Sequence, residues 1–368
     1  MSETALKTRI KALIETAGPI SVADYMGLCL ADPQHGYYMR REPFGTSGDF
    51  TTAPEVSQMF GELIGAWCLE VWSGLGRPEK LNLVELGPGR GTLMADVLRV
   101  ARLDPGFCAA AHVHLVETSP RLRSAQEQTL AAAPLPRTWH ETLESVPEGP
   151  TILVANEFFD ALPIRQYVLA SGNWHERVVG LDRGSGDLMF AAGPARLDTA
   201  GLPEDIANPK ARGIGDGAIL ETQPVANAIA GDIAARLTRH GGAALVIDYG
   251  YERTAIGDTL QALERHAFAD PFANPGEADI TAHVNFEALA RAAREEGAAI
   301  HGPMTQGDFL VALGLLERAG SLGSGKDVAV QERIRDDVER LAAPDQMGTL
   351  FKVLAFSSRC PAPRPFPG

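Results

Sequence analysis

One short stretch, LNLVELGPGRGTLMADVLRV at residues 81–100, constrains the fold more than any other part of the sequence. Its beginning, LNLVEL, is an apolar run of the length typical of a buried parallel strand. Gly87, Gly89 and Gly91 then allow backbone angles and close approaches that a Cβ would prevent. Thr92 can cap the amphipathic helix that follows. A strand, a glycine turn and a helix in this order predict a ligand site at the positive end of the helix dipole.

Composition and charge limit the class of protein. The chain has 368 residues, of which 45% are hydrophobic and 22% charged, as in an ordinary globular protein with an ample core. The formal net charge of -14 argues against a general binder of nucleic acid or of anionic membranes. Residues 1–18 lack a continuous apolar segment, and no later stretch is long enough to span a bilayer. We therefore predict a cytoplasmic protein with no membrane insertion and no nucleic-acid partner.

Cysteine and histidine spacing gives no sign of a metal centre. The four cysteines are far apart and form no C-x-x-C pair, which favours reduced thiols over a zinc site or a disulfide framework. His112 and His114 form an H-x-H pair, but the sequence places no third ligand nearby. The prediction is that the protein binds no metal.

Strand and helix patterns alternate along most of the chain. Strands are predicted at 81–86, in HVHLVETSP from His112 to Glu117, at 137–140, in TILVANEFFDALP (151–163) up to its polar cluster, at 243–250 and 298–301, and in the final block GTLFKVLAFSS. Helices are predicted at 4–16, 21–31, 54–72, 92–100, 120–130, 224–239, 286–296, 307–318 and 328–342. This alternation predicts an α/β fold with a mainly parallel, Rossmann-like sheet and helices on both faces.

The same patterns divide the chain into two expected domains. Residues 1–78 are predicted to form an N-terminal helical cap and a Gly-rich lid segment. Residues 79–368 are predicted to form the α/β domain, with insertions near 164–218 and 251–285. The first insertion begins with an alternating pattern typical of a hairpin, and its residues 185–216 show no clear periodicity.

Polar residues gather where the predicted strands end. Glu85, Glu117, Asn156, Glu157 and Asp248 all lie at or just beyond the carboxyl end of a predicted strand. Open parallel sheets bind ligands at this edge, where the strand order reverses. The convergence predicts a single site beside the glycine turn.

Three kinds of ligand compete for the glycine turn. A P-loop needs a lysine after the last glycine, whereas here Arg90 precedes Gly91 and no lysine follows. A dinucleotide turn needs a small residue at the position of Thr92 and an acid about 20 residues further on, and the sequence meets neither requirement. The pattern that remains is E-x-G-x-G-x-G at residues 85–91.

E-x-G-x-G-x-G after a buried strand resembles motif I of class I S-adenosylmethionine-dependent methyltransferases. The resemblance implies their sheet and their cofactor, S-adenosyl-L-methionine. It implies that Gly87, Gly89 and Gly91 lie against the methionine part of the cofactor. It also implies that Glu117 binds both ribose hydroxyls, as a carboxylate can. Glu85 would lie near the cofactor ammonium group or organise the turn.

Longer blocks resemble a narrower family. The blocks are DPQHGYYM, PFGTSGDFTTAPEVSQMFGE, VELGPGRGTL, ANEFFDALP, DITAHVNF and MGTLFKVLAF, and they span residues 32–356. Together they resemble the MidA-like methyltransferases, bacterial relatives of the mitochondrial complex I assembly factor that acts as a protein arginine methyltransferase. One departure is Asn285, where the family pattern more often has Asp. The resemblance implies the fold and the cofactor, and it suggests a protein substrate.

Catalytic candidates follow the strand that begins at Thr151. Asn156, Glu157 and Asp160 stand where class I methyltransferases place substrate-facing residues. Carboxylates there could orient a guanidinium through charge-assisted hydrogen bonds and help to remove a proton. The structural alternative is that Asn156 and Asp160 cap the following turn and that Glu157 is solvated.

A Gly-rich segment before the turn is the candidate lid. Residues 44–50, which include Gly48, are predicted to close over the cofactor, and Thr51 and Thr52 are predicted to make polar contacts with it. The alternative is a structural Ω-like loop.

The sequence therefore predicts an S-adenosylmethionine-dependent methyltransferase. Its expected acceptor is a protein arginine, such as one in a respiratory complex I subunit or its bacterial counterpart. Two alternatives stay open at this point, a small-molecule methyltransferase and a non-catalytic assembly chaperone that keeps the fold. A homo-oligomer is also left open.

Overall fold

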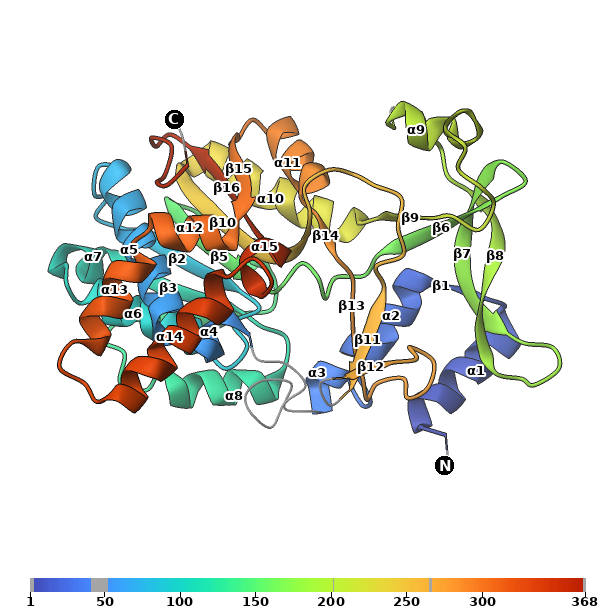
Figure 1. Ribbon diagram of the computed structural model, residues 1–368, viewed down its shortest axis with the longest axis horizontal. Helices are drawn as coiled ribbons and strands as arrows, with labels where there is room; N and C mark the ends of the chain where they lie inside the picture. The colour runs from blue at the N-terminus through green and yellow to red at the C-terminus, as the bar shows by residue number, and fades with distance from the viewer. Residues whose placement is uncertain (1–2, 41–51, 201, 265–266, 367–368) are drawn as a thin grey trace. The chain divides into compact units, whose positions relative to one another are not determined.

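The chain forms two compact units in the computed structural model, which describes residues 3–40, 52–200, 202–264 and 267–366 (Figure 1). The large unit comprises residues 44–159, 227–252 and 284–368, and the small unit comprises residues 1–43, 160–226 and 253–283. These boundaries differ from the predicted division at residue 78. The N-terminal helices share a unit with the insertions because β1 (Ile20–Ser21) pairs antiparallel with β7 (Asn173–Leu181).

The large unit contains the predicted sheet. Its strand order is β15-β16-β10-β5-β2-β3-β4, and β14 pairs with β10. The strands are β2 (Leu81–Leu86), β3 (Ala111–Val116), β4 (Arg137–His140), β5 (Thr151–Asn156), β10 (Gly242–Tyr251), β14 (Val284–Asn285), β15 (Ala299–Thr305) and β16 (Phe351–Ser358). All pairs from β10 to β4 are parallel, and β16 lies antiparallel between β10 and β15. The order reverses between β2 and β5, which is where ligand sites form in such sheets.

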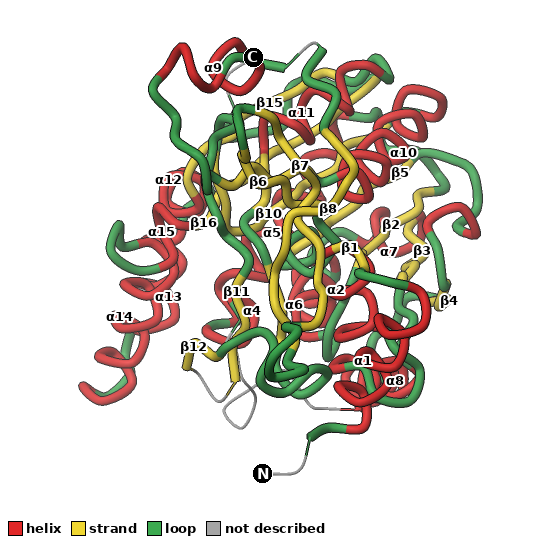
Figure 2. Tube along the Cα trace, turned by 90° about the vertical axis from the view of Figure 1, so that its right-hand side faces the viewer, coloured by secondary structure: helices red, strands yellow, loops and turns green. Residues whose placement is uncertain are grey.

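Helices cover both faces of this sheet (Figure 2). The helices of the large unit are α4 (Ala53–Val56), α5 (Gln58–Gly74), α6 (Thr92–Ala101), α7 (Pro105–Ala110), α8 (Pro120–Thr129), α10 (Pro224–His240), α11 (Phe286–Glu295), α12 (Gln306–Ala312), α13 (Leu315–Gly323), α14 (Val328–Ala342) and α15 (Met347–Leu350), with a 3₁₀ turn at Leu143–Ser145. The first residues of α10 belong to the small unit. Leu83 and Ile152 belong to the core that includes α5 and α6, and their neighbours Val84 and Leu153 are equally buried. Burial on both faces explains the continuous apolar runs of the sequence.

Two local predictions near the site were wrong. The single helix expected from Pro54 to Trp72 is two helices, because Ser57 is extended, with φ -157° and ψ 140°. Thr92 was expected to cap α6, but the residue in the cap position is Gly91. Thr92 is the first helical residue, and its hydroxyl donates to Glu55 instead.

The small unit is built from antiparallel strands and short helices. A five-stranded sheet contains β1, β7, β6 (Arg165–Ala170), β8 (Leu188–Arg196) and β9 (Ile219–Thr222), and a three-stranded sheet contains β11 (Gln261–Glu264), β12 (Ala267–Ala269) and β13 (Asp279–Thr281). The helices are α1 (Ala5–Ala17), α2 (Val22–Ala31), α3 (Tyr37–Arg40) and α9 (Glu204–Ala207), with a 3₁₀ turn at Pro209–Arg212. The β6–β7 hairpin confirms the sequence prediction. β8 was missed because most of its residues are not buried, which leaves little alternation to detect.

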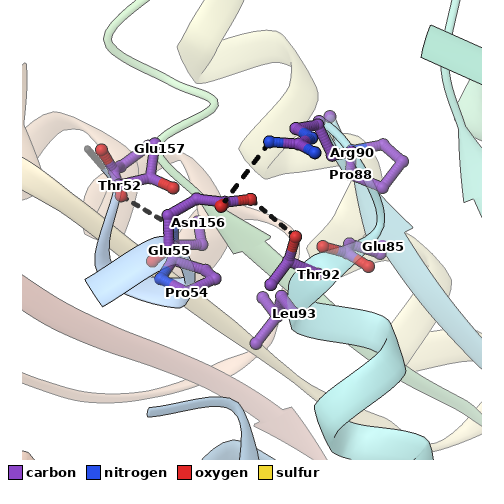
Figure 3. Close-up of a pocket in the computed structure, with 12 residues that line it drawn as sticks. Thr52, Pro54, Glu55, Glu85, Pro88, Arg90, Thr92, Leu93, Asn156 and Glu157 are labelled. Atoms are coloured by element: carbon purple, nitrogen blue, oxygen red, sulfur yellow. Dashed lines mark hydrogen bonds and ion pairs between the residues drawn. The ribbon is translucent and has the colours of Figure 1, made fainter. Parts of the chain in front are cut away.

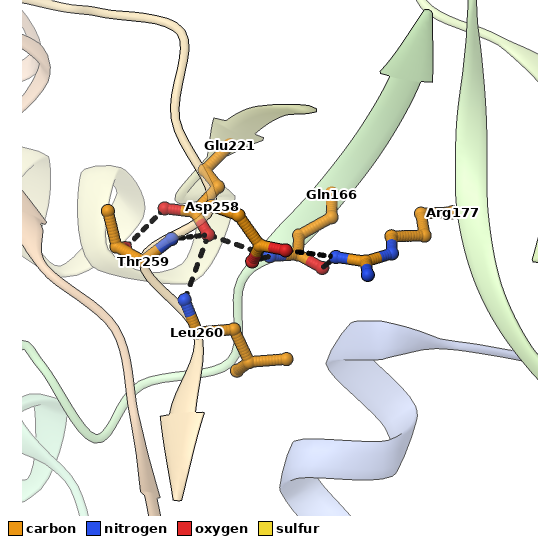
Figure 4. A network of polar contacts seen from close by, with 6 residues as sticks. All are labelled: Gln166, Arg177, Glu221, Asp258, Thr259 and Leu260. Carbon is orange, nitrogen blue, oxygen red and sulfur yellow. Dashed lines mark hydrogen bonds and ion pairs between the residues drawn. The ribbon is translucent and has the colours of Figure 1, made fainter. Parts of the chain in front are cut away.

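A buried carboxylate holds the second insertion against β9 (Figure 4). Glu221 is 2% exposed and accepts hydrogen bonds from the backbone N–H groups of Thr259, at 2.9 Å, and Leu260, at 3.2 Å. The side-chain amide of Gln166 on β6 donates to the same carboxylate at 2.7 Å. Since several donors converge on Glu221, its role is to anchor the segment that follows β10 to the small unit's sheet.

Among the residues that the structure describes, no helix is both long enough and apolar enough to cross a bilayer.

Histidines form a chain at the edge of the large unit's sheet. The Nδ1 atom of His114 on β3 lies 2.9 Å from the Nε2 atom of His140 on β4, and its Nε2 atom lies 3.2 Å from the side-chain oxygen of Asn82. The ring of His112 stacks on His114 with the centroids 4.5 Å apart. Burial, followed by the neighbouring charges of His112, His140 and Arg236, lowers the pKa of His114 to about 4.

The lowered pKa of His114 predicts that this histidine makes the stability of the protein sensitive to acid. Between about pH 6.5 and pH 4, His114 binds a proton in the unfolded chain but not in the folded one, so the free energy of unfolding falls as the pH falls. We expect His114→Asn to be less stable than wild type at pH 7 and to lose this disadvantage near pH 4.5, as measured by urea unfolding at both values. A pH-independent difference between the two proteins would contradict the assignment.

Candidate functional site

The glycine turn joins β2 to α6 and adopts backbone angles that favour glycine. Gly87, Gly89 and Gly91 have φ values of +61°, +52° and +83°. A Cβ on Gly87 would also lie 2.8 Å from the Phe158 ring, closer than real Cβ contacts allow. The pattern read from the sequence therefore has two physical causes at Gly87, the positive φ and the close approach of an aromatic ring.

A pocket opens above this turn at the carboxyl ends of β2 and β5 (Figure 3). It is lined by Thr52, Pro54, Glu55, Glu85, Gly87, Pro88, Gly89, Arg90, Thr92, Leu93, Asn156 and Glu157. The sequence predictions Thr52, Glu85, Gly87, Gly89, Asn156 and Glu157 are thus brought together in one place.

Glu85 is the buried acid of this pocket. Its side chain is 3% exposed, and its Oε2 atom has no hydrogen-bond partner among the described residues. Burial raises the pKa of Glu85 to about 8. A buried carboxyl group with an unused oxygen is costly unless a ligand supplies a donor or a positive charge.

Glu157 lies in a strained backbone conformation at the end of β5. Its φ is +50°, which costs a non-glycine residue on the order of 1–3 kcal/mol and occurs most often at functional sites. Its backbone N–H donates to the Ile247 carbonyl at 2.9 Å. Its Oε1 atom accepts from the Ala53 N–H and from the Asn156 side-chain amide, both at 3.0 Å. Glu157 therefore lines the pocket and holds the start of α4. The alternative prediction, that its side chain is simply solvated, does not match these contacts.

Asn156 keeps an acceptor available in the pocket. Its amide nitrogen is engaged by Glu157, whereas its Oδ1 atom is buried and has no partner among the described residues. Within the described part of the chain, Asn156 and Glu85 thus each present an unsatisfied oxygen at the same edge of the sheet.

Glu55 and Arg90 are site residues that sequence reasoning did not single out. The hydroxyl of Thr92 donates to the Oε1 atom of Glu55 at 2.6 Å, and an Arg90 guanidinium nitrogen lies 3.9 Å from its Oε2 atom. These contacts join α4 to the start of α6 (Figure 3). The only available signal was the position of Glu55 within the block GDFTTAPE, which carries the family resemblance.

Glu117 follows β3 but is not among the residues that line the pocket. It is 8% exposed, and its carboxylate accepts from the Ser119 N–H at 2.8 Å and from the Gln126 side-chain amide at 3.3 Å. Burial raises the pKa of Glu117, and these hydrogen bonds oppose the increase. The assignment of Glu117 to the ribose stays a prediction.

The remaining predicted residues have different settings. Thr52 precedes α4, and its carbonyl accepts from the backbone N–H of Glu55 at 2.9 Å. Asp160 belongs to the small unit, where its carbonyl accepts from the Ala282 N–H at 3.0 Å. Gly48, in the expected lid, and Thr51 lie outside the described residues. Within the described residues, no group of three or more His, Cys, Asp or Glu side chains is arranged to hold a metal ion.

Comparison with known proteins identifies the family. The family model described as "Putative S-adenosyl-L-methionine-dependent methyltransferase" matches residues 63–304. The chain belongs to this family. The MidA-like resemblance is confirmed, and the protein is a methyltransferase whose cofactor is S-adenosyl-L-methionine.

Similar proteins support the assignment over nearly the whole chain. The mitochondrial protein arginine methyltransferase NDUFAF7 of Xenopus tropicalis is 38% identical, over 95% of this chain and 85% of that protein. The protein of the same name from Homo sapiens is 35% identical, over 93% and 81%. A crystal structure from Burkholderia thailandensis, described as a "likely methyl transferase" bound to S-adenosyl-homocysteine, is 29% identical with a TM-score of 0.83 and covers 97% of this chain and 93% of that one.

The pocket has the features that this cofactor needs. The cofactor carries an ammonium group, and Glu85 offers a buried carboxyl group whose second oxygen has no partner in the described structure. The glycine turn lets the backbone approach a ligand. The cap position of α6 is Gly91, which supplies no side-chain cap, so the first N–H groups of the helix are left for an anionic group. Glu85 and the glycine turn therefore stay the predicted ligands of the cofactor, with Glu117 as the predicted ribose ligand.

The raised pKa of Glu85 predicts that cofactor binding releases a proton. At pH 7 a group with a pKa of about 8 is mostly protonated, and a nearby ammonium group lowers that pKa and displaces the proton. We expect wild type to release about one proton more than Glu85→Gln when it binds S-adenosylmethionine, and its affinity to rise from pH 6 to pH 8. Calorimetry in two buffers with different ionisation enthalpies measures the proton count. Equal counts in the two proteins would show that Glu85 organises the turn without meeting the ammonium group.

Proposed function

We propose that this methyltransferase modifies an arginine side chain of a protein, and that the acceptor belongs to a respiratory complex I subunit or its bacterial counterpart. The observation that carries the proposal is Glu157, a carboxylate in a strained conformation that lines the cofactor pocket beside Asn156. The curated relatives named protein arginine methyltransferases support the same acceptor. The expected cytoplasmic location and any homo-oligomer stay predictions.

The residues of the pocket suit a guanidinium acceptor. A bound cofactor supplies a methyl group on a sulfonium sulfur. Glu157 can hold the guanidinium through charge-assisted hydrogen bonds, and the carbonyl oxygen of the Asn156 side chain can accept a further N–H. A new N–C bond forms as the C–S bond breaks, the electron pair of that bond stays on sulfur, and the guanidinium loses a proton. The Glu157 carboxylate is the base assigned to receive that proton.

The chain's acidity is consistent with a basic acceptor segment. The net charge of -14 favours approach of a positively charged peptide through long-range attraction. Asp160 stays a predicted catalytic residue.

Proteome methylation tests the acceptor. The purified protein is incubated with isotopically labelled S-adenosylmethionine and an extract of cells that lack it, and mass spectrometry locates the label. We expect labelled methylarginine, and we expect Glu157→Gln to lower kcat about 100-fold or more because a base is lost. Glu332→Gln, on an exposed position of α14, is the matched control and should retain wild-type activity.

Other outcomes would favour the alternatives. Label confined to small molecules would replace the proposal with a small-molecule methyltransferase. Full complementation of cellular function by Glu157→Gln, with no methylation detected in either protein, would favour a non-catalytic assembly chaperone.

A further inference from the structure

Gln126 is a fully buried amide that joins three elements of the large unit. It lies on α8 with 0% of its surface exposed. Its Oε1 atom accepts from the indole N–H of Trp139 on β4 at 2.8 Å. Its Nε2 atom donates to the Gly89 carbonyl at 2.8 Å and to the Oε2 atom of Glu117 at 3.3 Å. Because an indole N–H can only donate, Trp139 determines which way the amide points.

The stem of Gln126 also packs beneath the glycine turn. A Cβ on Gly91 would lie 3.5 Å from the Cα and Cγ atoms of Gln126, which is ordinary van der Waals distance. Gln126 therefore lies close to Gly91 and forms a hydrogen bond with Gly89. Buried amides are costly unless their polar atoms are paired, so a core position of α8 occupied by glutamine calls for a specific purpose.

We propose that Gln126 is a positioning residue for cofactor binding, which sets the Glu117 carboxylate relative to the glycine turn. The inference rests on the proposed roles of those two groups, the turn at the methionine part of the cofactor and Glu117 at the ribose. Gln126 itself does not line the pocket, so it acts through its neighbours.

Gln126 contacts the side chain of Glu117, whereas other residues hold the backbone of Glu117. The backbone carbonyl of Glu117 accepts from the Nε atom of Arg123 at 2.7 Å, and its N–H donates to the His140 carbonyl at 2.9 Å. Those contacts do not involve Gln126. Loss of the Gln126 amide leaves the carboxylate with the backbone N–H groups of Ser119 and Thr118 and removes its side-chain donor, so the Oε2 atom can turn away from the direction needed for two adjacent hydroxyls.

The test measures recognition of the ribose rather than activity. Calorimetry determines the affinities for S-adenosylhomocysteine and for its 2′-deoxy analogue with wild type, Glu117→Ala, Gln126→Leu and Gln128→Leu. Gln128 is an exposed residue of the same helix, so Gln128→Leu controls for the effect of replacing a glutamine of α8 by leucine. We expect wild type and Gln128→Leu to prefer the ribose form by about 10-fold or more, as a hydrogen bond to a charged group allows. In Gln126→Leu and Glu117→Ala the preference should fall to about 2-fold or less.

Trp139→Phe provides a second variant that leaves Gln126 in place. It removes the indole N–H that orients the amide and keeps an aromatic ring, although a smaller one, and we expect it to reduce the preference to an intermediate value. Thermal melting of each variant establishes that it is folded. If Gln126→Leu does not fold, an unchanged preference in Trp139→Phe overturns the inference.

The outcomes separate the inference from the function on which it rests. An unchanged preference in Glu117→Ala would overturn the ribose assignment and the inference with it. A preference lost in Glu117→Ala but kept in Gln126→Leu would overturn the inference alone. If Gln126→Leu weakens the binding of S-adenosylhomocysteine and of its 2′-deoxy analogue by the same factor, Gln126 has only a structural role, and the inference is overturned.

Discussion

The parallel pairing of β2 between β3 and β5 is the constraint on which the site depends. In register, Leu86 lies beside Val116 on one neighbour and Ala155 on the other, so the three strands end at one level. The next residues along the three segments, Gly87, Glu117 and Asn156, therefore lie at the same edge. The strand order reverses here, and open parallel sheets bind ligands at such a reversal.

The carboxylates at this edge differ in function because their surroundings differ. Glu85 is buried with an unused oxygen, which makes it a weak acid that can respond to a cation. Glu117 is held by hydrogen bonds that point its oxygens in defined directions. Glu157 is displayed by a strained backbone and also anchors α4. Methyl transfer depends mainly on alignment and exclusion of water, so this positioning is the main task of the scaffold.

The sequence was sufficient to predict the sheet, the glycine turn and the cofactor. Runs such as LNLVEL are local and carry strong periodicity, and the E-x-G-x-G-x-G pattern is contiguous, so neither needs knowledge of distant contacts. The break at Ser57 and the strand β8 were missed for the opposite reason. A helix continues or stops according to what its ends contact, and a largely unburied strand shows no alternation.

By itself the sequence determined the order of the elements, the turn that needs glycine and the family, because these depend on neighbours along the chain. Only the tertiary structure decided which partners those residues have. The sequence predicts that Thr92 caps a helix, but in the structure its hydroxyl donates to Glu55, 37 positions away in the chain. No pattern in the sequence marks Gln126, and only folding encloses it between Gly89 and Glu117. Such hydrogen bonds join segments that meet only when the sheet assembles, and a linear pattern contains no record of them.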